Sequence, residues 1–254
     1  MTIDVAGVPV TALGLGLALL GLALGGWVKG LIGLGLPMAA LPLLTHVVGL
    51  KGAISLLSVS IIAVNIWQAI DGGHLPSMLR RFWPVALAMA IGIGVGTWAL
   101  KTIDPQPLYA VAGIAVLLAL ASNLFRPDIA ISPDLERWIG PIAGALAGLL
   151  GGVSSLFGPP LVIFLVGLKL TKDEFVAAIA LLYLLGGIPL LFGLMFQGIM
   201  GGEALVLSVL AMLPVAAGML IGQRLRARLD GPRFTKLILA FMAFLAFSLI
   251  AKSI

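Results

Sequence analysis

Lys29 is the residue whose chemistry stands out first in this sequence. It is the only Lys, Arg, Asp or Glu between Val8 and Val48, a stretch made almost wholly of apolar residues. A lysine near the middle of a membrane helix costs about 2.5–3.5 kcal/mol on insertion scales, so it needs a partner or a function. The predicted helices of the first half contain no Asp or Glu to pair with it. We therefore predict that Lys29 supplies the positive charge of an anion site. The alternative is a lysine at a helix end that reaches the membrane surface or lines the turn of a hairpin.

Glycine and proline interrupt the apolar run around Lys29, and a similar stretch recurs later in the chain. The first stretch, 25–37, reads GGWVKGLIGLGLP, and the second, 148–160, reads GLLGGVSSLFGPP. In a helix, glycine costs about 1 kcal/mol relative to alanine and an interior proline about 3 kcal/mol. The two clusters therefore indicate two helices that are broken inside the membrane.

Unwound backbone at membrane depth is tolerated only beside a water-filled cavity or buried in protein. Helix N-termini at such breaks offer N–H donors and the positive end of the helix dipole to an anion. Three glycines of the two stretches are candidate binding positions: Gly30, Gly33 and Gly158. The alternative is that glycine pairs such as Gly26 and Gly30 let two helices pack closely.

Further polar side chains fall inside or at the ends of apolar segments, where they could reach the same cavity: Ser154, Ser155, Asn65, Gln68 and Tyr183. The two serine hydroxyls can donate to sulfonate or carboxylate oxygens, or bond back to carbonyls of their own helix. Asn65 and Gln68 share one helix face. Tyr183 lies at a similar depth in the corresponding segment of the second half.

His46, near the end of the second apolar segment, is a candidate for proton coupling because an imidazole titrates near neutral pH. A structural role at a helix end is the alternative. The chain has two histidines and no cysteine, and every Asp and Glu falls in a loop or at a helix end. We therefore predict no metal, no cofactor and no enzymatic activity.

Composition assigns the chain to the membrane. Hydrophobic residues make up 61 % of its 254 residues and charged residues only 10 %, whereas a soluble domain has about 45–50 % and about 25 %. Basic residues outnumber acidic ones by five, but they sit in short gaps between apolar runs. They therefore read as topology signals and not as a surface for nucleic acid.

Ten segments approach the roughly 20 apolar residues that a transmembrane helix needs. Those of the first half are 8–26, 30–48, 52–70, 82–100 and 107–125, and those of the second are 138–151, 156–168, 175–197, 204–222 and 234–251. The N-terminal segment lacks the positive start of a signal peptide, so it reads as a retained first helix. The predicted fold is an all-α, polytopic transmembrane bundle.

The two halves line up when the chain is shifted by about 122 residues, which places Gly26 on Gly148 and Pro37 on Pro159. This register predicts a first repeat at 1–125, a cytoplasmic linker at 126–137 and a second repeat at 138–254. An odd number of crossings in each repeat makes the two copies inverted, as in many transporters. It also places the basic loop 223–236 and most other Lys and Arg residues in the cytoplasm. Whether 8–48 and 138–168 are full spans or re-entrant hairpins is left open.

The sequence resembles the sulfite exporter TauE/SafE family. The resemblance rests on the glycine-rich stretch Gly30–Gly35 with Pro42 in the first half, and on 151–160 with Phe164 and Leu165 in the second. It extends over essentially the whole chain by length, spacing and duplication. It implies a multi-pass carrier of the inner membrane for sulfite, organosulfonates or related small anions, and it favours export over import.

The predicted function is therefore secondary transport of a small anion through a central cavity. The driving force would be an H⁺ or Na⁺ gradient, the membrane potential or the substrate's own gradient. The expected partners are the anion, the lipid bilayer and a possible coupling ion; the oligomeric state is left open. The alternatives are a small-anion channel and a membrane scaffold or assembly factor without transport.

Overall fold

The computed structural model describes residues 2–5, 8–71, 75–99 and 130–252, together with a few positions between 107 and 125. The expected segment 107–125 therefore lies largely outside the described residues. An antiparallel hairpin of β1 (Thr2–Val5) and β2 (Val8–Thr11) precedes the helices. The helices are α1 (Ala12–Ile32), α2 (Leu36–Asp71), α3 (Leu75–Ala99), α5 (Pro133–Ser154), α6 (Gly158–Gly167), α7 (Lys172–Phe196), α8 (Gly202–Leu210), α9 (Met212–Ala227) and α10 (Gly231–Lys252).

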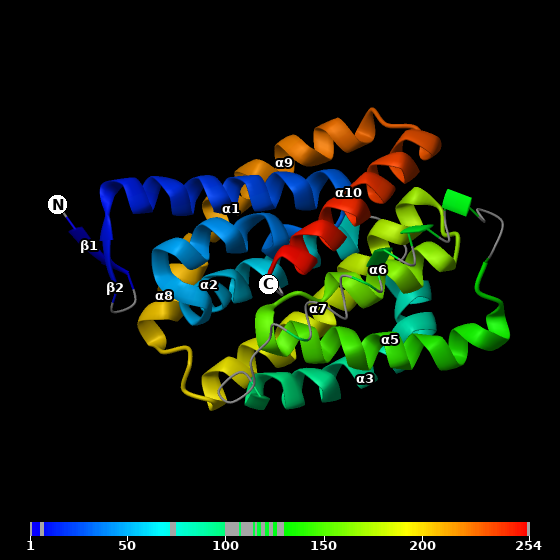
Figure 1. Ribbon diagram of the computed structural model, residues 1–254, viewed down its shortest axis with the longest axis horizontal. Helices are drawn as coiled ribbons and strands as arrows, with labels where there is room; N and C mark the ends of the chain where they lie inside the picture. The colour runs from blue at the N-terminus through cyan, green and yellow to red at the C-terminus, as the bar shows by residue number, and fades with distance from the viewer. Residues whose placement is uncertain are drawn as a thin grey trace.

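The molecule is an elongated helical bundle (Figure 1). Within the described residues, six helical segments are long and apolar enough to cross a membrane: α1, α2, α3, α7, α8 continued by α9, and α10. This confirms the predicted class of polytopic transmembrane helical protein. In α7, 67 % of the apolar 18-residue stretch is buried inside the bundle, whereas in α10 only 33 % is buried. The helix α7 is therefore central and α10 is peripheral.

Several element boundaries differ from those expected. The first helix begins at Ala12, after the β-hairpin, and continues to Ile32. The segments expected at 30–48 and 52–70 form one element, α2, with a kink at Gly49, where φ is 69°. The helix α5 begins at Pro133, inside the stretch expected to be a linker, because Ser132 caps it by accepting from the Leu135 N–H. The segment expected at 204–222 is divided between α8 and α9 at Ala211.

Both predicted helix breaks are present, and they correspond residue for residue under the shift that aligns the halves. The first helix of each half ends at a residue in the left-handed conformation, Gly33 with φ 89° and Ser155 with φ 58°. The Gly33 N–H donates to Lys29 O, and the Ser155 N–H donates to Gly151 O. A second helix then begins at Leu36 in one half and at Gly158 in the other. These matches support an internal duplication; the inverted arrangement of its copies stays a prediction.

The helical stretches that follow the two breaks are short compared with the thickness of a membrane. At a rise of 1.5 Å per residue, the stretch of α2 before the Gly49 kink covers about 20 Å, and α6 covers about 15 Å. A bilayer core is about 30 Å thick. The stretch of α2 before its kink and the helix α6 are therefore each shorter than the bilayer core.

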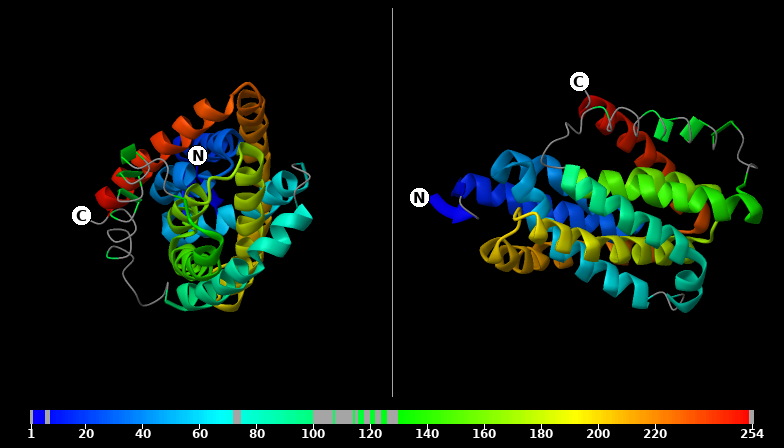
Figure 2. Two further views of the ribbon diagram at one scale, coloured as in Figure 1. Left: turned by 90° about the vertical axis from the view of Figure 1, so that its right-hand side faces the viewer. Right: turned by 90° about the horizontal axis from the view of Figure 1, so that it is seen from below.

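Glycines allow two helix pairs to pack with their backbones in contact. In α1, a Cβ added to Gly26 or Gly30 would collide with the backbone of α9. In α3, a Cβ added to Gly92 or Gly96 would collide with the backbone of α5. The first helix of each half therefore packs on a helix of the other half, and Figures 1 and 2 show these pairs on opposite sides of the bundle. For Gly26 and Gly30, the close-packing interpretation is the one that the structure supports.

Several basic loops meet at one end of the bundle. Arg81, in the first turns of α3, forms a 2.6 Å ion pair with Glu136 at the start of α5. Lys172, at the start of α7, donates to Leu229 O between α9 and α10 at 3.2 Å. The N-terminal hairpin lies at the opposite end (Figures 1 and 2). Loops predicted to be cytoplasmic therefore share one end, as the predicted orientation requires.

Candidate functional site

Lys29 lies in the last turn of α1 and is completely buried, with 0 % of its surface exposed. Its Nζ donates to Gly33 O at 2.6 Å and to Asn65 Oδ1 at 2.5 Å. The first acceptor belongs to the break that ends α1, and the second belongs to α2 beyond its kink. The ammonium therefore points into the protein, which excludes the alternative in which it reaches the membrane surface.

Asn65 and Gln68 lie on one face of α2 and both contact the Lys29 residue. The Asn65 amide group donates to Ile61 O at 2.6 Å, which leaves its oxygen to accept from Lys29. Gln68 Nε2 donates to the backbone oxygen of Lys29 at 3.1 Å. The exposed fraction of each side chain is 2 % or less. The face of α2 that was inferred from their spacing is thus the face that packs against the last turn of α1.

Tyr183 connects this cluster to the second break. The Lys29 Nζ lies 5.2 Å from the centre of the Tyr183 ring, a cation–π distance. The Tyr183 ring also packs edge-on against Phe157, with the ring centres 5.3 Å apart. The Tyr183 hydroxyl lies 3.0 Å from where a Cβ on Gly158 would stand. Both helix breaks therefore converge on one tyrosine of the central helix α7.

The two serines of the second break differ in what their hydroxyls do. Ser154 Oγ donates to Leu150 O at 2.8 Å, so its hydrogen bond is made within its own helix. Ser155 Oγ is buried and has no hydrogen-bond partner among the described residues. Of the two, Ser155 is the hydroxyl left available for a ligand.

The remaining predicted positions serve other purposes or lie elsewhere. Gly30 faces α9, as described above, and Gly33 allows the close approach of Val176 from α7, 3.0 Å from where its Cβ would stand. His46 is exposed near the Gly49 kink and so lies outside the buried cluster. Phe157 was not among the predicted site residues; a phenylalanine in an apolar segment carries no signal of its own.

A protein-family model described as sulfite exporter TauE/SafE matches residues 17–249. The chain belongs to the sulfite exporter TauE/SafE family. Searches of curated proteins and of solved structures gave no match.

Membership of the TauE/SafE family confirms the resemblance predicted from the glycine-rich stretches. It also makes the chain a multi-pass protein of the inner membrane, in keeping with its six candidate spans. The family consists of transporters. The buried cluster around Lys29 lies well inside the matched region, and so do both helix breaks.

The electrostatics of this TauE/SafE protein set Lys29 apart. Lys29 is the only Lys, Arg, Asp or Glu among the described residues whose side chain is buried. No carboxylate in the described part of the chain forms an ion pair with it; the ion pairs found there lie at helix ends. An ammonium has three N–H donors, and Gly33 and Asn65 accept two of them. One N–H donor remains for a ligand.

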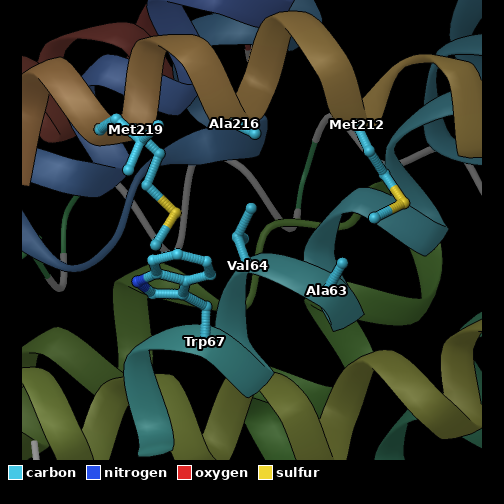
Figure 3. A pocket seen from close by; sticks show the side chains of 7 residues that line it. Ala63, Val64, Trp67, Met212, Ala216 and Met219 are labelled. Carbon is cyan, nitrogen blue, oxygen red and sulfur yellow. The ribbon is translucent and has the colours of Figure 1, made fainter. Parts of the chain in front are cut away.

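An apolar pocket opens on the other side of α2, between α2 and α9 (Figure 3). Its volume is about 140 Å³, and Trp67, Val64 and Met219 are among its lining residues. In Figure 3 the Met219 side chain reaches down to the Trp67 indole. This pocket presents almost no polar surface, so it is not the anion site.

Proposed function

We propose that this protein is a secondary transporter of small anions, with sulfite or an organosulfonate as substrate and export as the favoured direction. The observation that carries the proposal is Lys29, a fully buried ammonium with no acidic partner among the described residues, next to the first helix break. A buried charge without a counter-charge costs several kcal/mol. An anion that binds beside it supplies the missing charge.

The helices that begin at the two breaks direct the positive ends of their dipoles toward the interior of the bundle. Both α2 and α6 begin at a break, so their N-termini face the interior of the bundle. The N-terminus of a helix carries about half a positive charge and N–H groups without helical acceptors. Phe157, at the N-cap of α6, makes no side-chain cap. Pro159 and Pro160 carry no N–H, so the donor that the first turn of α6 offers to a ligand is the N–H of Gly158. Together these groups favour an oxyanion.

Lys29, Asn65, Gln68 and Tyr183 are each 2 % exposed or less, so this conformation is closed around the proposed site. Transport then requires the site to open to each side in turn. The paired helices α1–α9 and α3–α5 each join the two halves, and rocking of one half against the other would open the central cluster alternately, as in inverted-repeat carriers. An H⁺ or Na⁺ gradient, or the anion gradient itself, would drive the cycle.

Flux measurements on the purified protein in proteoliposomes test the proposed function. We expect uptake of radiolabelled sulfite or methanesulfonate that saturates with concentration and exceeds the leak of protein-free vesicles. The same anions should raise the melting temperature, because a ligand that binds only the folded state stabilises it. A non-saturating, much faster flux would indicate a channel, and absence of both flux and stabilisation would indicate a scaffold.

Replacement of Asn65 by aspartate offers a nearly isosteric test of the site. In Asn65→Asp, a carboxylate would stand 2.5 Å from the Lys29 Nζ and supply the counter-charge that the substrate otherwise provides. We expect anion stabilisation and transport to fall by about 100-fold, on the basis of about 3 kcal/mol for a charge-assisted bond. The matched control is Asn65→Ser, which removes the contact without adding charge and should retain more activity. Equal activity of Asn65→Asp and the unmodified protein would exclude Lys29 as the anion-binding group.

A further inference from the structure

The apolar pocket between α2 and α9 lies on the outer surface of two membrane-spanning segments. The small residues Ala63 of α2 and Ala216 of α9 leave it open beside the longer side chains of Trp67 and Met219 (Figure 3). Trp67 is 55 % exposed, and Leu220, which also lines the pocket, is 43 % exposed. Because both helices belong to candidate spans, a surface exposed here faces hydrocarbon and not water.

One end of the pocket leads toward a positive charge. Arg224 lies one turn beyond Leu220 on the same side of α9, and it is exposed. It takes part in none of the ion pairs found among the described residues, and α9 itself contains no Asp or Glu. In Figure 3 the indole nitrogen of Trp67 lies at the same end, nearer Met219 than Met212. A tryptophan near the membrane surface directs its N–H toward the headgroups in this way.

The dimensions of the pocket fit a lipid chain better than a helix. Ala216 precedes Arg224 by 8 residues, or about 12 Å along the helix axis, which is less than half of a hydrocarbon core about 30 Å thick. A phosphate at Arg224 would therefore place its acyl chain beside the pocket. One helical turn, about 5.4 Å long and about 10 Å wide, occupies about 400 Å³, whereas the pocket holds about 140 Å³.

We propose that this pocket binds one acyl chain of an anionic phospholipid whose phosphate pairs with Arg224. The inference is independent of the proposed transport function. A basic residue at the end of a groove between membrane helices suits an anionic headgroup, and the apolar lining suits the chain. Neither feature alone would select a lipid, but together they distinguish an anionic phospholipid from a zwitterionic one. The bound lipid would join α2 of the first half to α9 of the second.

The fluorescence of Trp67 can report whether the pocket is occupied. The chain has five tryptophans, so the other four are replaced by phenylalanine. The protein is then reconstituted in phosphatidylcholine vesicles with rising fractions of phosphatidylglycerol or phosphatidylcholine that carries bromine on its acyl chains, which quenches a neighbouring indole. We expect half-maximal quenching at a mole fraction about fivefold lower for phosphatidylglycerol, the factor for one arginine near a membrane surface. In the unmodified protein, phosphatidylglycerol should raise the melting temperature more than phosphatidylcholine does.

Two pairs of variants test the headgroup and the chain separately. Arg224→Gln should abolish the preference for phosphatidylglycerol, whereas Arg137→Gln, in α5 on the opposite side of the bundle, should retain it. Ala216→Leu fills the pocket and should abolish the preference, whereas Ala217→Leu, at an exposed position outside the pocket lining, should not. Equal quenching by the two lipids, or a preference that survives Arg224→Gln or Ala216→Leu, would overturn the proposal. Protection of Trp67 from both lipids, in a particle with twice the mass of one chain, would assign the pocket to a second copy instead.

Discussion

Replacing Lys29 by methionine is expected to abolish saturable anion transport in a protein that still folds. Methionine has a similar length and no charge, so it fills the buried volume but offers neither an N–H donor nor a counter-charge. A hydrogen bond to a charged group contributes about 1.5–3 kcal/mol, and the upper value corresponds to roughly 100-fold in affinity. Loss of the charge itself adds to this. We therefore expect flux in proteoliposomes to fall to the level of protein-free vesicles.

A control variant and a melting-temperature measurement separate the role of the charge from a role in folding. Lys51→Met removes a lysine that is exposed beyond the Gly49 kink and should transport as the unmodified protein does. Methionine at position 29 leaves the Asn65 amide oxygen without its donor, which costs about 1–3 kcal/mol of stability. The melting temperature is therefore measured beside the flux. A folded Lys29→Met protein that transports normally would remove Lys29 from the site.

The grouping of the polar residues around Lys29 was predictable from the sequence because polar groups are costly inside a membrane. Lys29, Asn65, Gln68 and Tyr183 were singled out as polar residues in apolar segments, and the structure brings all four into contact or close to it. Spacing alone put Asn65 and Gln68 on one face, which is the face that meets Lys29. A polar side chain at this depth must find its hydrogen-bond partners inside the protein, and few such partners exist there.

Other features could not be predicted because they depend on tertiary contacts. The α-helical pattern does not indicate that Gly30 meets the backbone of α9 at Met219, because any glycine-rich face can pack against several partners. Nor does it indicate that Ser154 bonds to its own helix while Ser155 remains unpartnered; the αL conformation of Ser155 decides this. The role of Phe157 follows from a space that only the folded chain creates.

The two helix breaks were easier to predict from the sequence than the exact ends of the helices were. Alignment of the halves predicted two corresponding breaks, and the equivalent bonds Gly33 N–H to Lys29 O and Ser155 N–H to Gly151 O bear out that correspondence. The ends of helices were less predictable, since Ser132 caps α5 within a stretch that composition marks as a loop. Breaks are encoded locally by glycine and proline, whereas the packing partners of each helix are settled by tertiary contacts.

The glycine-mediated pairing of α3 with α5 gives the second prediction with a large effect. Gly92 lies against the backbone of Ala145 and Leu149 so closely that even one methyl group would force the two helices apart. The Gly92→Ala variant is therefore expected to destabilise the protein by about 1–3 kcal/mol or more, the usual cost of overpacking a tight contact. At roughly 2–4 °C per kcal/mol for a chain of this size, the melting temperature should fall by several degrees.

Gly94 supplies the matched control, because it lies two residues along the same helix and no atom stands within 4 Å of the place where its Cβ would be. Two residues correspond to about 200° of helical rotation, so Gly94 faces away from α5. Gly94→Ala should leave the melting temperature unchanged or raise it slightly, since alanine favours a helix by about 1 kcal/mol over glycine. The difference between the two variants measures the backbone contact alone, free of helix propensity. Equal melting temperatures for the two variants would mean that α3 and α5 do not pack through Gly92, and that the joining of the two halves on this side of the bundle has another basis.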